Sequence, residues 1–127
     1  MKAGFDVMGH ASIALTLLFT VYGQLVLRWQ ISGAGQLPPG TGEKVAFLLR
    51  QLANPWIVSG LAAAFLASMA WMAAMTRFEL SYAYPFMSLA FVIAMVFSVL
   101  FLGETVNLAR MLGTALVVAG LVIIAKA

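Results

Sequence analysis

Four long apolar segments with almost no charge constrain this chain more than any other feature of its sequence. They cover about residues 7–27, 56–75, 82–102 and 108–125. Each has about the 20 residues that an α-helix needs to cross ~30 Å of hydrocarbon. Only 9% of the 127 residues are charged and 64% are hydrophobic, whereas a soluble domain carries roughly 25% charged residues. The sequence therefore predicts an all-α membrane protein with four transmembrane helices in a single domain spanning residues 1–127.

The composition also narrows the chemistry. With no cysteine, the chain cannot form a disulfide, a thiolate metal site or a cysteine nucleophile. One histidine and four acidic residues offer no nucleophile–base pair, no paired carboxylates and no metal set. The net charge of +3 is small and scattered. We therefore expect no enzyme activity, no metal, no cofactor and no nucleic-acid partner.

The connection between the first two apolar segments contains a short amphipathic segment. Residues 30–42 are rich in glycine and proline, and Asn54-Pro55 precedes the second apolar segment. Between them, residues 43–53 are too short to span a bilayer and suit a helix lying in the headgroup plane. The apolar face of this predicted interfacial helix consists of Val45, Leu48, Leu49 and Leu52.

The first apolar segment carries polar residues at steps of four: Ser12, Thr16, Thr20, Gln24 and Arg28. This spacing keeps them on nearly one helix face, which in a membrane should face protein or a cavity. The hydroxyls could instead only hydrogen-bond within or between helices, and Arg28 could extend to the membrane interface. The amide of Gln24 and the guanidinium of Arg28 favour a functional role for this face, because both groups can hold a phosphate.

The start of the third segment combines a proline with nearby hydroxyls. Pro85 removes a helical hydrogen bond to the carbonyl near Ser81. In hydrocarbon, that carbonyl must find another donor or line a wet cavity, and Tyr82, Tyr84 and Ser88 are nearby. The alternative is an ordinary helix start, where proline is harmless and tyrosines lie at the headgroup level.

The second and fourth segments carry small residues. Alanine, serine and glycine dominate residues 59–74, which lets backbones approach closely. On the fourth segment, Gly113, Val117 and Gly120 share one face and predict a dimer seam, although packing within the chain would also explain them. Arg110 could pair with Glu104 just before this segment.

The distribution of cations gives a weak orientation signal. Three of them, Lys2, Arg77 and Lys126, fall on one side of the membrane, and four fall on the other: Arg28, Lys44, Arg50 and Arg110. The positive-inside rule favours both termini outside the cytoplasm. So small a margin is also compatible with insertion in both directions.

Three local motifs resemble the four-helix, EamA-like branch of the drug/metabolite transporter superfamily. They are Gly23-Gln24-Leu25 followed by Arg28, the stretch Ala83-Tyr84-Pro85-Phe86-Met87-Ser88-Leu89, and Leu102-Gly103-Glu104 followed by Gly113 and Gly120. The second is similar to the Ala-Tyr-Pro-x-x-Ser-Leu motif of subunits that flip aminoarabinose-phosphoundecaprenol. This resemblance implies a multi-pass subunit of the bacterial inner membrane that moves a polyprenyl-phosphate-linked sugar.

The chain departs from the small multidrug resistance exporters of the same superfamily at two positions. Thr20 stands where these exporters carry a proton-exchanging glutamate, and Met87 stands where they carry a tryptophan. A threonine cannot hold or release a proton near neutral pH. The departures favour the lipid-flippase branch. They predict that the substrate either moves by facilitated transport or is coupled to an energy source other than proton exchange at this position.

The leading hypothesis is a headgroup path open sideways to lipid. Its predicted lining residues are Thr16, Thr20, Gln24 and Arg28, with Tyr82, Tyr84 and Ser88 near the break at Pro85. Arg28 would hold the phosphate, and Gln24 and the tyrosines would contact sugar or phosphate oxygens. Four short spans enclose little volume, so we expect a homodimer or a heterodimer with a similar subunit. The alternatives are an exporter of small cationic solutes and a non-transport accessory subunit of a membrane glycosyltransferase.

Overall fold

The computed structural model of the chain describes residues 6–127 and consists of helices joined by short connections. The elements are α1 (Val7–Ser32), α2 (Thr41–Arg50), η1 (Gln51–Ala53), α3 (Pro55–Met75), α4 (Leu80–Ala83), η2 (Tyr84–Met87), α5 (Ser88–Leu102) and α6 (Leu108–Lys126). Four helical stretches are long and apolar enough to cross a membrane: 7–32, 55–75, 80–102 and 108–126. The predicted all-α membrane fold is confirmed, including a short helix between the first two spans. Lys2, one of the cations used for orientation, lies outside the described residues.

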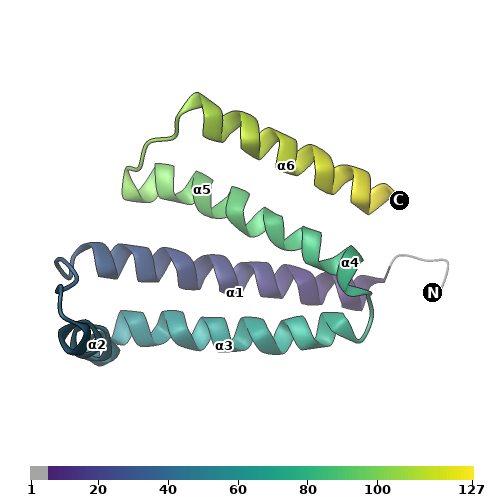
Figure 1. Ribbon diagram of the computed structural model, residues 1–127. Helices are drawn as coiled ribbons and strands as arrows, with labels where there is room; N and C mark the ends of the chain where they lie inside the picture. Colours follow the sequence, from purple (N-terminus) through teal and green to yellow (C-terminus); the bar gives the residue numbers. More distant parts are fainter. Residues whose placement is uncertain (1–5) are drawn as a thin grey trace.

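Successive long helices run in opposite directions and form a bundle with α1 near its middle (Figure 1). Helix α3 runs along one side of α1, α5 crosses its other side at an angle, and α6 is outermost. Helix α2 lies at the end of the bundle where α1 finishes, and the C-terminus lies at the opposite end. The end of α1, the α5–α6 connection and the start of α6 are therefore at the same end as α2.

Glycine lets α1 and α3 approach each other closely. A Cβ atom placed on Gly23 would lie 2.9 Å from the carbonyl oxygen of Gly60, and one placed on Gly60 would lie 3.4 Å from that of Gly23. Ala63 and Ala67 of α3 are buried beside this contact. The small-residue face of the second span thus serves packing within the chain, as small residues commonly do between membrane helices.

Polar side-chain caps mark the start of three of the four spans. The Asp6 carboxylate accepts a hydrogen bond from the Gly9 amide at 2.9 Å. Asn54 and Asn107 cap α3 and α6 in the same way. Each cap satisfies an amide that the first helical turn leaves without a partner, which matters most where water is scarce.

The region around Pro85 is a change of helix type within one span. Helix α4 ends at Ala83, a 3₁₀ turn covers Tyr84–Met87, and α5 continues from Ser88. The chain tightens here because proline cannot donate the α-helical hydrogen bond. Ala83 is fully buried at this turn and packs with Ile13, Leu17 and Ala74 in the apolar core.

Two helices leave most of their apolar surface open. On α2 and η1, the predicted apolar face is exposed, while Phe47 is buried. Phe47 does not belong to the predicted apolar face. On α6, only Thr114 and Leu121 are buried. These open surfaces suit lipid, which is as apolar as the side chains themselves.

Candidate substrate path

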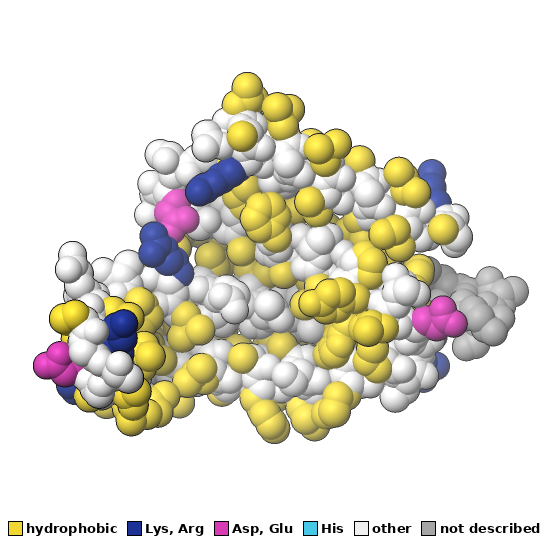
Figure 2. Space-filling model, viewed as in Figure 1, with side chains coloured by type: hydrophobic (Ala, Val, Ile, Leu, Met, Phe, Trp, Pro, Cys, Tyr) yellow, Lys and Arg dark blue, Asp and Glu magenta, His cyan; other side chains and the backbone are white. Residues whose placement is uncertain are grey.

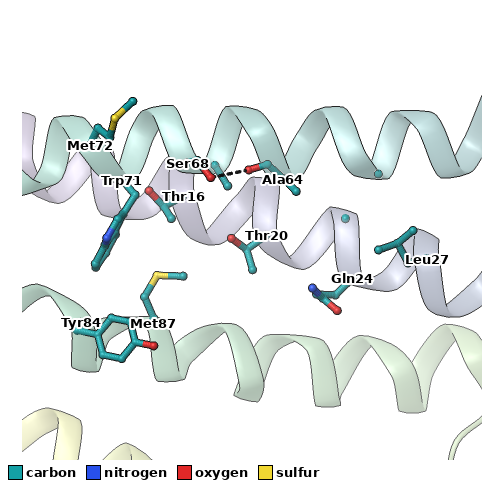
Figure 3. A pocket seen from close by; sticks show the side chains of 13 residues that line it. Thr16, Thr20, Gln24, Leu27, Ala64, Ser68, Trp71, Met72, Tyr84 and Met87 are labelled. Carbon is teal, nitrogen blue, oxygen red and sulfur yellow. Dashed lines mark hydrogen bonds between the residues drawn. The ribbon is translucent and has the colours of Figure 1, made fainter. Parts of the chain in front are cut away.

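A groove of about 400 Å³ opens between α1, α3 and the η2 turn. Figure 3 shows Thr16, Thr20 and Gln24 along α1, with Tyr84 and Met87 on one side of the groove and the α3 side chains Trp71 and Met72 on the other. The remaining lining residues are Gly23, Leu27, Gly60, Ala64, Ala67 and Ser68. Three members of the predicted ladder therefore face the same space as one predicted tyrosine.

The hydroxyls in this groove differ in how they are used. The Thr16 hydroxyl donates to the Ser12 carbonyl at 2.8 Å, and the Ser68 hydroxyl donates to the Ala64 carbonyl at 3.2 Å. Each of these hydroxyls bonds to the carbonyl four residues earlier in its own helix. For Thr16, this is the structural role that the sequence left open as an alternative to substrate binding. By contrast, the side chains of Thr20 and Gln24 form no hydrogen bond with any other residue that the structure describes. They are the polar groups that a ligand could engage.

Tyr84 stands at the open edge of the groove. Its ring packs edge-on against Trp71, with 6.1 Å between the ring centroids, and the residue is 64% exposed. Because the ring packs against Trp71 while most of the residue is exposed, Tyr84 can present its hydroxyl to a ligand without moving the helix that carries it.

A second groove of about 360 Å³ continues from the first between α1, α5 and the start of α6. Gln24 lines both grooves. The second groove is also lined by Arg28, Ser98, Glu104 and Arg110. The polar residues of α1 from Thr16 to Arg28 therefore follow one line across two adjoining grooves, which we call the polar track.

Arg28 has a partner at the end of the polar track. Its Nε donates to a carboxylate oxygen of Glu104 at 2.6 Å. The sequence suggested Arg110 for Glu104, and the structure corrects this pairing. Gly103 adopts a left-handed conformation with φ of 70°, which ends α5, and the Glu104 amide turns back to donate to the Ser98 carbonyl at 3.2 Å. The connection therefore brings Glu104 to α1.

Two predicted lining residues lie elsewhere. The Tyr82 hydroxyl hydrogen-bonds to Nε2 of His10 at 3.0 Å, and its ring contacts those of Phe78 and Phe86. The Ser88 hydroxyl donates to the Pro85 carbonyl at 2.6 Å. Neither residue lines the polar track. Residues two apart on a helix point to different faces, so Tyr82 and Tyr84 could not both face the groove.

An apolar groove of about 540 Å³ flanks α1 and α5 next to the polar track. Except for Tyr22, all of its lining residues are hydrocarbon or phenyl side chains: Ala14, Leu17, Leu18, Val21, Leu25, Ile93, Phe97 and Phe101. Leu25 also lines the second polar groove. A largely apolar surface and a charged one therefore meet at Leu25.

The predicted dimer seam is open on this chain. A Cβ atom on Gly113 or Gly120 would meet nothing within 4 Å, and Val117 is exposed. Packing against another helix of the same chain therefore does not explain these small residues. A seam between two subunits stays a prediction.

Four apolar spans and an open polar track are the features of a multi-pass membrane transporter. The chain belongs to the EamA-like transporter family, whose model matches residues 11–126, and it is a multi-pass protein of the inner membrane. It is 27% identical over 108 residues to the probable 4-amino-4-deoxy-L-arabinose-phosphoundecaprenol flippase subunit ArnE from Aeromonas hydrophila, which covers 85% of this chain and 89% of that protein. No solved structure is significantly similar to the chain.

Proposed function

We propose that this transporter is a subunit that flips a polyprenyl-phosphate-linked sugar across the inner membrane. The observation that carries the proposal is the continuity of the polar track, because Gln24 lines both grooves. A headgroup that left one groove would meet hydrogen-bonding groups of the next. The relative named as a probable flippase subunit acts on a lipid-linked sugar of this class.

The openness of the grooves suits a substrate that is half lipid. A polyprenyl chain has no reason to leave hydrocarbon, so only the headgroup needs a polar surface. A closed pore would have to admit the tail, whereas a groove on the side of a bundle does not. The apolar groove beside the track, which meets it at Leu25, offers a surface along which the tail could lie.

Each polar residue of the track has a role in this proposal. Arg28 binds the phosphate, because a guanidinium offers several donors in a fixed plane. Thr20 and Gln24 have no hydrogen-bond partner in the described part of the chain and contact sugar or phosphate oxygens. Tyr84 adds a hydroxyl at the edge. A second subunit, the same or similar, would cover the exposed side of the track.

The predicted exporter of small cations is less well supported. Proton coupling would need a carboxylate that is free to titrate in the path. Glu104 is the carboxylate that lines the track, and it holds Arg28. We therefore place lipid-linked sugar first.

Inverted membrane vesicles from the native host would test the proposal, because any partner subunit is then present. A fluorescent polyprenyl-phosphate sugar is added, and its movement to the inner leaflet is followed by protection from a membrane-impermeant quencher. Vesicles with the wild-type chain should protect it faster than vesicles lacking the chain, and Arg28→Gln and Tyr84→Phe should slow the movement. Tyr82→Phe, which changes a tyrosine outside the track, is the matched control. Equal rates for the wild type, Arg28→Gln and Tyr84→Phe would contradict the proposal.

A further inference from the structure

The end of the polar track holds more donors than its one carboxylate can use. Arg28, Glu104 and Arg110 line the same groove. Figure 2 shows dark blue and magenta side chains together where the α5–α6 connection meets the end of α1. The guanidinium of Arg28 donates to Glu104 through Nε, but a guanidinium carries five N–H donors. Among residues 6–127, the side chain of Arg110 has no hydrogen-bond or ion-pair partner.

We propose that Glu104 occupies the place of a lipid phosphate, and that an anionic lipid headgroup displaces it from Arg28 and binds between Arg28 and Arg110. This inference deepens the proposed function and rests on it for the class of lipid. Carboxylate and phosphate oxygens accept the same charge-assisted bonds from a guanidinium, so one can replace the other on Arg28 without changing the donor.

The charges of this cluster match a phosphodiester. Two arginines and one glutamate leave one positive charge, and a phosphodiester carries one negative charge. A lipid with one phosphodiester would therefore bring the cluster to neutrality. A cation would instead meet two arginines, so the same cluster disfavours a positively charged headgroup at this end of the track.

The exposure of the ion pair permits the exchange. The side chain of Arg28 is 61% exposed and that of Glu104 is 36% exposed, and ion pairs exposed to this degree contribute little to stability. The pair nevertheless joins the end of α1 to the connection between α5 and α6. Its release would free the mouth of the groove at the moment the headgroup arrives, so Glu104 is a gate as well as a competitor.

Lipid binding by the full-length protein tests this exchange without requiring transport. The protein in phosphatidylcholine nanodiscs is titrated with phosphatidylglycerol, whose headgroup is a polyol phosphodiester, and bound lipid is measured by native mass spectrometry. Glu104→Gln should raise the apparent affinity about fivefold, the upper range for an exposed ion pair. Arg110→Gln in the Glu104→Gln background should reverse this gain. Glu43→Gln removes a carboxylate at the same end of the bundle and should leave the affinity unchanged.

The outcomes separate this inference from the proposed function. Glu104→Gln with wild-type affinity, or Arg110→Gln without effect in that background, would overturn the exchange even if sugar flipping is observed. A gain in affinity together with no flipping would support the exchange and count against the flippase. Competition with a polyprenyl-phosphate-linked sugar, which is also a phosphodiester, identifies the source of the phosphate. Preferential retention of this lipid over phosphatidylglycerol supports the lipid-linked sugar, and equal retention supports a site for membrane phosphodiesters in general.

Discussion

Helices α1 and α3 form a tightly packed pair, whereas α5 and α6 form a loose one. In the first pair, backbone approaches backbone at Gly23 and Gly60, and both helices bury residues along their lengths. In the second pair, α5 buries none of its residues fully and α6 buries two. The polar track runs along the face of the tight pair and ends at the loose one. A rigid helix thus presents the donors, while the element that closes the groove has little packing to hold it in place.

This difference has a physical reason in the membrane. Lipid covers apolar side chains as well as protein does, so exposed leucines on α6 are not destabilising. Close packing is needed only where polar groups must be kept in a fixed geometry. The glycine contact lies beside Gln24, at the centre of the track, where that requirement is greatest.

The largest effect is expected from Gly23→Ala. The added methyl group would lie 2.9 Å from the Gly60 carbonyl oxygen, so the two helices must move apart. Overpacking of this kind costs about 1–3 kcal/mol in the free energy of unfolding. Gly113→Ala, where nothing lies within 4 Å, is the matched control and should not destabilise the monomer. Unfolding in mixed detergent micelles gives both values, and equal stabilities would contradict the contrast between the two pairs.

A change in transport is expected from Gln24→Leu. Its amide faces both grooves and has no partner in the described chain, so folding should tolerate leucine while the headgroup loses a hydrogen bond. Loss of about 1.4 kcal/mol would slow flipping about tenfold. Gln36→Leu makes the same change in an exposed loop. If both variants flip at the wild-type rate, the track does not carry the headgroup.

The two neighbouring tyrosines should separate stability from function. Tyr82→Phe removes the 3.0 Å hydrogen bond to His10 and should lower the free energy of unfolding by about 1 kcal/mol. Tyr84→Phe removes a hydroxyl at the open edge of the groove and should leave stability unchanged while slowing flipping. The same unfolding and vesicle measurements apply to both. If Tyr84→Phe lowered stability and Tyr82→Phe slowed flipping, the two tyrosines would have the opposite roles, and Tyr84 would not be the residue that faces the headgroup.

Much of the fold could be predicted because the length and spacing of hydrophobic segments are local properties of the sequence. The four spans follow from apolar segments of about 20 residues, and the short helix between the first two follows from an amphipathic segment too short to span a bilayer. The α1 ladder also follows from spacing alone, since steps of four keep residues on one face. The grooves along this ladder could not be predicted in the same way, because α3, α5 and α6 form their other walls.

The contacts that were missed join residues far apart in the sequence. Arg28 and Glu104 are separated by 76 positions, and nothing in their local patterns distinguishes Arg28 from Arg110 as the partner. The antiparallel order of the spans placed all three at one end, but the left-handed Gly103 decided the pairing. The separation of Tyr82 and Tyr84, by contrast, follows from their spacing, because residues two apart on a helix point to different faces.

The smallest effect on the monomer is expected from Gly113→Leu and Gly120→Leu. These variants also test whether the open face of α6 is a seam between two subunits. A Cβ atom placed on either glycine would meet nothing within 4 Å, so neither substitution should destabilise the monomer by more than about 0.5 kcal/mol. A leucine would nevertheless keep a partner helix from approaching the seam.

Energy transfer between labelled copies in vesicles, or between this chain and a similar subunit, measures the association. Both leucine variants should weaken it. Ala115→Leu is the matched control, because Ala115 is exposed and lies about 200° around the helix from Gly113. If association survives at both glycines, the seam prediction is wrong. If Ala115→Leu weakens association equally, the partner contacts α6 on more than one face, and the interface is broad and not confined to the glycine seam.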